Sequence, residues 1–138
     1  MLKFKKFDGR VAVEYNKELS LEKGKDLWNT VYSFRYYIGK PEDNTYIVVP
    51  AGFTTDGASV PRFLWKYIPP WGIYGNAAIV HDWLCTHKAI IVDNEYVSVN
   101  NKRIDSIFYE AMKVSDVPWF LRQIIYLGVR VGDMIGLR

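Results

Sequence analysis

The chain has 138 residues, of which 49% are hydrophobic and 24% charged, and this balance predicts a single domain over residues 1–138 and excludes a disordered polypeptide. Aromatic residues make up 16%, so a dense core can form without disulfides, and one cysteine, Cys85, excludes a secreted disulfide scaffold. The net charge of +3 comes without a tight basic cluster, so no nucleic-acid partner is expected.

The sequence contains no window suited to crossing a membrane. The nearest candidate, residues 117–137, is interrupted by Arg122, Arg130 and Asp133. The N-terminal residues 1–7 are basic, but neither an apolar run nor a cleavage site follows them. We therefore expect no transmembrane segment and no secretion by a signal peptide.

The first half of the chain carries strand patterns. Residues 2–15 alternate apolar and polar around Asp8-Gly9, which predicts a hairpin. A polar stretch follows over residues 16–26. Residues 27–38 and 46–49 are rich in aromatic and β-branched side chains, which predicts a second strand pair.

The second half carries helix patterns. Ser59-Val60-Pro61 predicts the start of a short helix over residues 62–68, and a longer helix is expected from Gly75-Asn76 to His87. Another helix, capped by Ser98 or Asn100, runs to about Val114, and residues 119–135 supply the last one.

Residues 90–92 and 96–99 form either a small hairpin or a loop between these helices. In the last helix an apolar side is expected to pack on the sheet, with a membrane surface or a partner as alternatives; it consists of Phe120, Ile124, Leu127 and Val131. The predicted class is α+β, with N-terminal antiparallel hairpins or sheet followed by a bundle of three to four helices.

The most specific candidate site combines His81-Asp82 with Asp105 on the following helix. If these two helices are antiparallel, Asp105 can accept a hydrogen bond from one ring nitrogen of His81. The other nitrogen can then act as a base toward water, as in any imidazole oriented by a carboxylate. His81 and Asp105 are therefore the candidate catalytic residues.

Asp82 points about 100° away from His81 on a helix, so it serves a different partner. Together with Asp56 it could bind Ca²⁺ or another divalent cation through carboxylate oxygens. The loop containing Thr55, Gly57 and Ser59 would support this site, since Gly57 permits a tight turn.

A purely structural role is the alternative to each of these functional hypotheses. The acids and the histidine can form a satisfied polar network that cross-links elements of the fold. Cys85 is best explained as a small buried hydrophobe, and His87 as a favourable charge at a helix end.

A group of aromatic and proline residues is either core or an exposed contact surface for another protein. Its candidate contact residues are Trp65, Pro69, Pro70 and Trp71.

The ordered motifs VPAGFTTDGASVP (residues 49–61), IPPWG (68–72), HDWL (81–84), DSIF (105–108) and VPW (117–119) closely resemble a phage and prophage family, domain of unknown function 1353. The motifs cover residues 49–119. The resemblance implies a tailed-phage or prophage origin, and the family name records no activity.

The order of His81, Asp82 and Asp105 also resembles the active-site helices of phospholipase A2. That resemblance implies a histidine base held by Asp105 and a calcium ligand at Asp82. Cys85 stands where that family usually has tyrosine, and its disulfides and calcium loop have no counterpart here.

Together these patterns favour a metal-assisted hydrolase acting on ester or amide bonds of the host envelope. The alternatives are a non-enzymatic tail or neck protein that contacts other virion proteins, and a binder of a host protein. The expected location is the host cytoplasm or the virion, and the sequence leaves the oligomeric state open.

Overall fold

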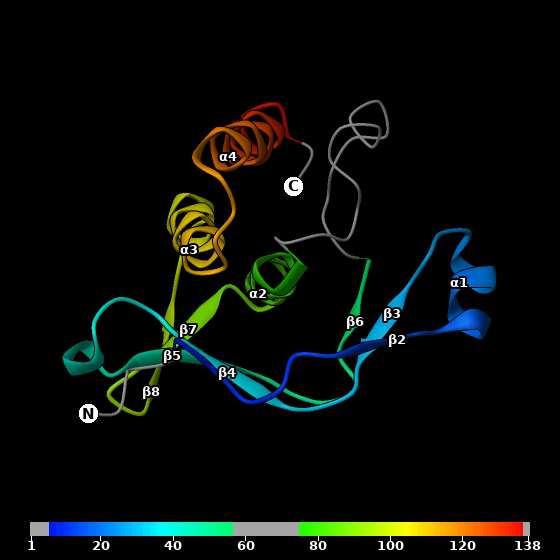
Figure 1. The fold of residues 1–138 in the computed structure, drawn as a ribbon, viewed down its shortest axis with the longest axis horizontal. Helices are drawn as coiled ribbons and strands as arrows, with labels where there is room; N and C mark the ends of the chain where they lie inside the picture. The colour runs from blue at the N-terminus through cyan, green and yellow to red at the C-terminus, as the bar shows by residue number, and fades with distance from the viewer. Residues whose placement is uncertain (1–5, 57–74, 137–138) are drawn as a thin grey trace. The chain divides into compact units, whose positions relative to one another are not determined.

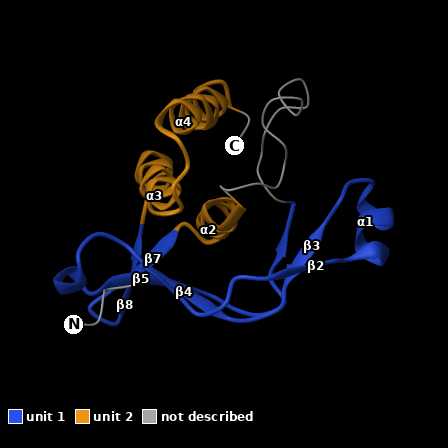
Figure 2. Ribbon diagram, viewed as in Figure 1, with its two compact units in different colours: residues 1–56, 89–98 blue, residues 57–88, 99–138 orange. Residues whose placement is uncertain are grey.

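The computed structural model describes residues 6–56 and 75–136 and divides into two compact units (Figures 1 and 2). The first unit comprises residues 1–56 and 89–98, and the second comprises residues 57–88 and 99–138. The first contains the sheets and the second contains the three long helices. That the whole chain forms one domain stays a prediction.

The first unit contains two antiparallel sheets. The larger has the order β1-β4-β5-β7-β8, with β1 (Phe7–Asp8), β4 (Phe34–Tyr37), β5 (Thr45–Val49), β7 (Ala89–Val92) and β8 (Glu95–Ser98). The smaller has the order β2-β3-β6, with β2 (Val13–Tyr15), β3 (Trp28–Thr30) and β6 (Thr54–Thr55).

Strands β4 and β5 supply the core of the larger sheet. Phe34 pairs with Val49 and Tyr36 pairs with Ile47, and all four side chains are buried. The residues between them are less buried, as expected for strands whose side chains alternate between two faces. The predicted second strand pair is therefore confirmed for β4 and β5.

Strands β7 and β8 form a hairpin, which settles the alternative between hairpin and loop. The two residues between them, Asp93 and Asn94, have φ of 49° and 67°. A two-residue turn of this kind needs positive φ at both positions, and Asp and Asn tolerate it better than most residues.

The predicted hairpin over residues 2–15 is wrong. Strand β1 pairs with β4, whereas β2 pairs with β3 in the other sheet. Gly9 has φ of 109°, and a Cβ there would lie 3.1 Å from the Cβ of Phe34 and from the carbonyl oxygen of Ser33. Gly9 therefore serves the close approach of two chain segments rather than a turn between β1 and β2.

The predicted single strand over residues 27–38 is likewise divided between the sheets, as β3 and β4. The polar stretch after β2 contains helix α1 (Lys17–Lys23), capped by the Asn16 side chain, which accepts from the Leu19 amide at 3.0 Å. A 3₁₀ helix, η1 (Pro41–Asp43), lies in the loop before β5.

The second unit contains α2 (Gly75–His87), α3 (Asn101–Val114) and α4 (Trp119–Met134), and α3 packs against both of the others (Figure 2). These helices confirm the three long helices predicted from the sequence. The apolar stripe of α3 is buried, and its members are Ile104, Ile107, Phe108, Ala111 and Met112. The predicted helix over residues 62–68 lies outside the described residues.

The expectation that the apolar side of α4 packs on the sheet stays a prediction, whereas the contacts of α4 within the second unit use the other side of the helix. Ile125 and Val129, on the opposite side, are the buried residues of this helix. Phe120 is 70% exposed and Leu127 is 64% exposed. We call the apolar set on the other side the α4 stripe; it consists of the exposed Phe120, Leu127, Val131 and Met134 and the half-buried Ile124.

The architecture is α+β, with antiparallel sheets mainly in the N-terminal half followed by helices, as the sequence predicts. Among the described residues, no helix combines the length and the apolar character that a membrane span requires.

Gly9→Ala tests the contact that replaces the predicted hairpin. The new Cβ meets both an unfavourable φ and two close neighbours, so we expect a loss of about 2 kcal/mol or more in the free energy of unfolding. The matched control is Gly52→Ala, where φ is 85° but nothing lies within 4 Å of the new Cβ. Urea denaturation measures both, and equal losses would contradict the packing role of Gly9.

Candidate active site

The candidate site lies within the second unit, where α2 carries His81 and α3 carries Asp105. The Asn100 side chain caps α3 by accepting a hydrogen bond from the Arg103 amide at 2.8 Å, which fixes where the helix begins. Both site residues lie on inward faces: His81 is 8% exposed and Asp105 is fully buried.

The His81 ring is held by the Asp105 carboxylate. Its Nε2 lies 2.9 Å from Oδ1 of Asp105, in the arrangement expected from the sequence. An ionised carboxylate only accepts hydrogen bonds, so Nε2 carries the proton and Nδ1 of the neutral ring carries the lone pair. The Phe108 ring packs beside the imidazole, with centroids 4.4 Å apart, and restricts its orientation.

Asp105 also binds a third helix. The Nη1 of Arg130 on α4 donates to Oδ2 of Asp105 at 2.7 Å. Each carboxylate oxygen therefore has its own cationic or polar partner, which offsets the cost of burying the charge. One side chain of α3 thus ties α2 and α4 together.

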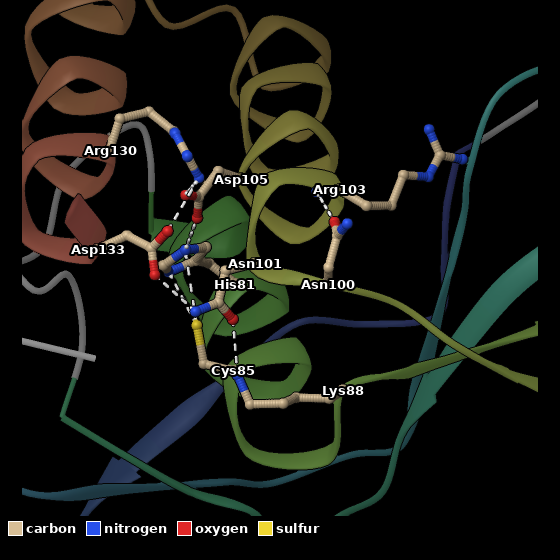
Figure 3. Close-up of polar contacts among 9 residues, drawn as sticks. All are labelled: His81, Cys85, Lys88, Asn100, Asn101, Arg103, Asp105, Arg130 and Asp133. Atoms are coloured by element: carbon tan, nitrogen blue, oxygen red, sulfur yellow. Dashed lines mark hydrogen bonds and ion pairs between the residues drawn. The ribbon is translucent and has the colours of Figure 1, made fainter. Parts of the chain in front are cut away.

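The network continues toward the surface of the unit (Figure 3). Arg130 lies 3.4 Å from Oδ2 of Asp133, and Asn101 donates to Oδ1 of Asp133 at 2.6 Å. The Lys88 ammonium donates in turn to Oδ1 of Asn101 at 2.6 Å. The polar chain therefore begins at a buried imidazole and ends at an exposed lysine.

Arg130, Asp133 and Asn101 are the site residues that sequence reasoning missed. Arg130 and Asp133 served only as evidence against a membrane span. Their signal was present, because two opposite charges three residues apart in an otherwise apolar helix face the same side and need a polar partner.

Cys85 lies one turn after His81, with its Sγ 3.6 Å from Nε2 and 3.9 Å from Nδ1. A hydrogen bond in the plane of the ring to one nitrogen would place the sulfur much farther from the other nitrogen. The nearly equal distances therefore put the thiol beside the ring rather than in line with either nitrogen. This geometry differs from that of a thiol activated by a histidine base.

The candidate metal ligands lie on separate elements. Asp82 is partly buried on α2, and Asp56 follows β6, where its Oδ2 is 3.4 Å from the Lys25 ammonium. Thr55 is buried within β6. Among the described residues, no three His, Cys, Asp or Glu side chains are grouped to hold a metal ion.

The remaining predicted residues lie outside the described part of the chain. They are Gly57 and Ser59 of the supporting loop, and Trp65, Pro69, Pro70 and Trp71 of the candidate contact surface.

The fold and the site define an α+β protein with a buried polar network across three helices. Comparison with protein families places residues 28–129 in the family described as Protein of unknown function (DUF1353). The chain belongs to this family, which confirms the resemblance seen in the sequence motifs. Comparisons with curated proteins and with solved structures found no match.

Asp105→Ala tests whether this carboxylate holds the three helices. The substitution leaves His81 and Arg130 without their shared anion, so we expect the free energy of unfolding to fall by about 3–5 kcal/mol. Lys25→Ala is the control, because it breaks an ion pair whose side chains are 60% and 39% exposed, and we expect a change below about 1 kcal/mol. Chemical denaturation measures both, and comparable losses would contradict a special role for Asp105.

Proposed function

We propose that the protein is a hydrolase in which His81 is the general base and Asp105 positions it. The observation that carries the proposal is the 2.9 Å contact between Nε2 of His81 and a fully buried carboxylate. Such a contact fixes the tautomer that leaves the lone pair on Nδ1, and it stabilises the imidazolium that forms when the base takes a proton.

In the proposed reaction, Nδ1 of His81 accepts a proton from a water molecule as the water oxygen attacks the carbonyl carbon of an ester or amide. The tetrahedral intermediate then collapses, the bond to the leaving group breaks, and the imidazolium returns its proton to the leaving oxygen or nitrogen. The products are a carboxylic acid and an alcohol or amine, and the enzyme regains its starting protonation.

Arg130 is a positioning residue in this scheme. A carboxylate bound at one oxygen can rotate, whereas Asp105 is held at both, by His81 and by Arg130. The imidazole is therefore oriented by an anion that is itself fixed, as pre-organised catalysis requires. The positive charge of Arg130 also offsets the charge of the buried carboxylate.

The substrate class we propose is an ester or amide of the bacterial envelope, and the setting is a phage or prophage, with the protein acting in the host cytoplasm or from the virion. The setting follows from the resemblance of the motifs to a phage family, and the ester or amide class follows from a base that activates water. A divalent cation as cofactor is a separate part of the proposal, and assays with Ca²⁺ and with a chelator address it.

A second candidate function is a non-enzymatic role as a virion or assembly protein. The observation that favours it is the continuation of the network through Asp133, Asn101 and Lys88, which suits a cross-link between helices as well as an active site. Quantitative mass spectrometry of purified particles tests it, because a structural component is present in a fixed number of copies. A binder of one host protein would instead be recovered with that protein in a pull-down.

His81→Ala tests the proposed chemistry. We expect hydrolysis of ester, phospholipid or peptidoglycan substrates to fall by at least roughly 100-fold, the usual contribution of a general base. The variant also takes the partner of Oδ1 away from the buried Asp105, so the melting temperature should fall, and circular dichroism at the assay temperature checks that the variant is folded. His87→Ala is the matched control, since it removes an exposed histidine from the same helix. A wild-type protein inactive on all these substrates, with and without Ca²⁺, would refute the proposal.

Asp105→Asn tests whether the carboxylate orients His81, because the substitution removes the carboxylate but keeps a side chain of similar size in the buried position. The amide has nearly the same shape, but it can donate to the ring and so no longer selects the Nε2–H tautomer. We expect kcat to fall by several orders of magnitude with little change in KM. Steady-state kinetics measures kcat and KM separately, and an unchanged kcat would exclude Asp105 as the residue that orients His81.

A further inference from the structure

The α4 stripe is a large apolar surface on a helix that is already packed on its other side. Phe120, Leu127 and Met134 are 70%, 64% and 78% exposed, and Val131 is 44% exposed. The opposite side is held to α3, where Gln123 donates to the Tyr109 hydroxyl at 2.6 Å. The helix is therefore ordered without using its stripe, and covering the stripe would require no further folding of α4.

The spacing of the α4 stripe is that of a coiled-coil seam. Successive members are separated by four, three, four and three residues, which is the a/d spacing of two heptads. Ile124 and Val131 then occupy the a positions, and Phe120, Leu127 and Met134 occupy the d positions. β-Branched residues at a with Leu at d favour a parallel, two-stranded arrangement, and Ile124, Leu127 and Val131 match that pattern.

We propose that the α4 stripe is a homodimer interface, in which α4 packs in parallel against α4 of a second copy. A twofold axis brings each seam residue against its own counterpart, so the surface must be complementary to itself. All five members are apolar, so no like charges would meet across the axis. This proposal is independent of the proposed hydrolase activity.

The exposed area is sufficient for such an interface. Five large side chains that are 44–78% exposed, namely the four exposed members of the stripe and the adjacent Ile135, present on the order of 500 Å² per copy. Two copies would thus bury about 1,000 Å², which reaches the lower limit for a specific interface.

The charges of α4 favour a protein over a lipid surface. Helices that lie on membranes usually display lysines and arginines along a polar face. Here Arg130 is engaged by Asp105 and Asp133, and Arg122 donates to the Val117 carbonyl and lies over the Tyr109 ring. Both cations of α4 therefore bind within the second unit.

Leu127→Asp tests the dimer on the full chain. Analytical ultracentrifugation should show wild-type protein at twice the chain mass, and the variant should dissociate at least roughly 100-fold more readily because two carboxylates would meet in an apolar seam. Leu21→Asp is the matched control, since Leu21 is a comparably exposed leucine (73%) on another helix, and it should stay dimeric. Circular dichroism checks that both variants fold.

Met134→Cys tests the parallel register. In a parallel pair the two new thiols face each other, so mild oxidation should give a covalent dimer, whereas wild type, which has only Cys85, should not cross-link. A monomeric wild type at high micromolar concentration would overturn the proposal, as would binding of the monomer to anionic vesicles through the stripe. A dimer that Leu127→Asp leaves intact would overturn it as well.

Discussion

The buried carboxylate of Asp105 is the constraint on which the three-helix unit depends. A fully buried anion is costly unless each of its oxygens has a good partner, and these partners come from different helices: His81 from α2 and Arg130 from α4. The same contacts that stabilise the charge therefore fix the relative placement of the three helices. They also decide which nitrogen of His81 carries a proton, so packing and chemistry in this unit have one origin.

The sequence predicted the helical unit better than the sheets. The apolar stripe of α3 follows the helical period, and the sequence led us to expect the contact between His81 and Asp105, although the β7–β8 hairpin lies between their two helices. The strands are short, and their partners are distant in the chain. The pattern of residues 6–15 does not show that β1 joins β4 while β2 joins β3, because both partner strands lie outside this segment.

The sequence likewise predicted only part of the site. His81, Asp82 and Asp105 lie in recognisable motifs, so the sequence alone indicated them as candidate site residues. Arg130 lies 25 residues after Asp105, on the next helix, and only the packing of α4 on α3 brings it to the carboxylate. The same packing determines which side of α4 is buried, and an amphipathic pattern alone cannot show whether the apolar side meets the protein's own core or another chain.

The central claim is that Asp105 holds the His81 ring with its proton on Nε2 and its lone pair on Nδ1. Long-range ¹H–¹⁵N correlation spectra of the histidine rings, assigned with a His87→Ala variant, report this tautomer directly. The account predicts a neutral His81 ring protonated at Nε2, and loss of that preference in Asp105→Asn. A ring protonated at Nδ1, with its lone pair turned toward the carboxylate, would contradict it.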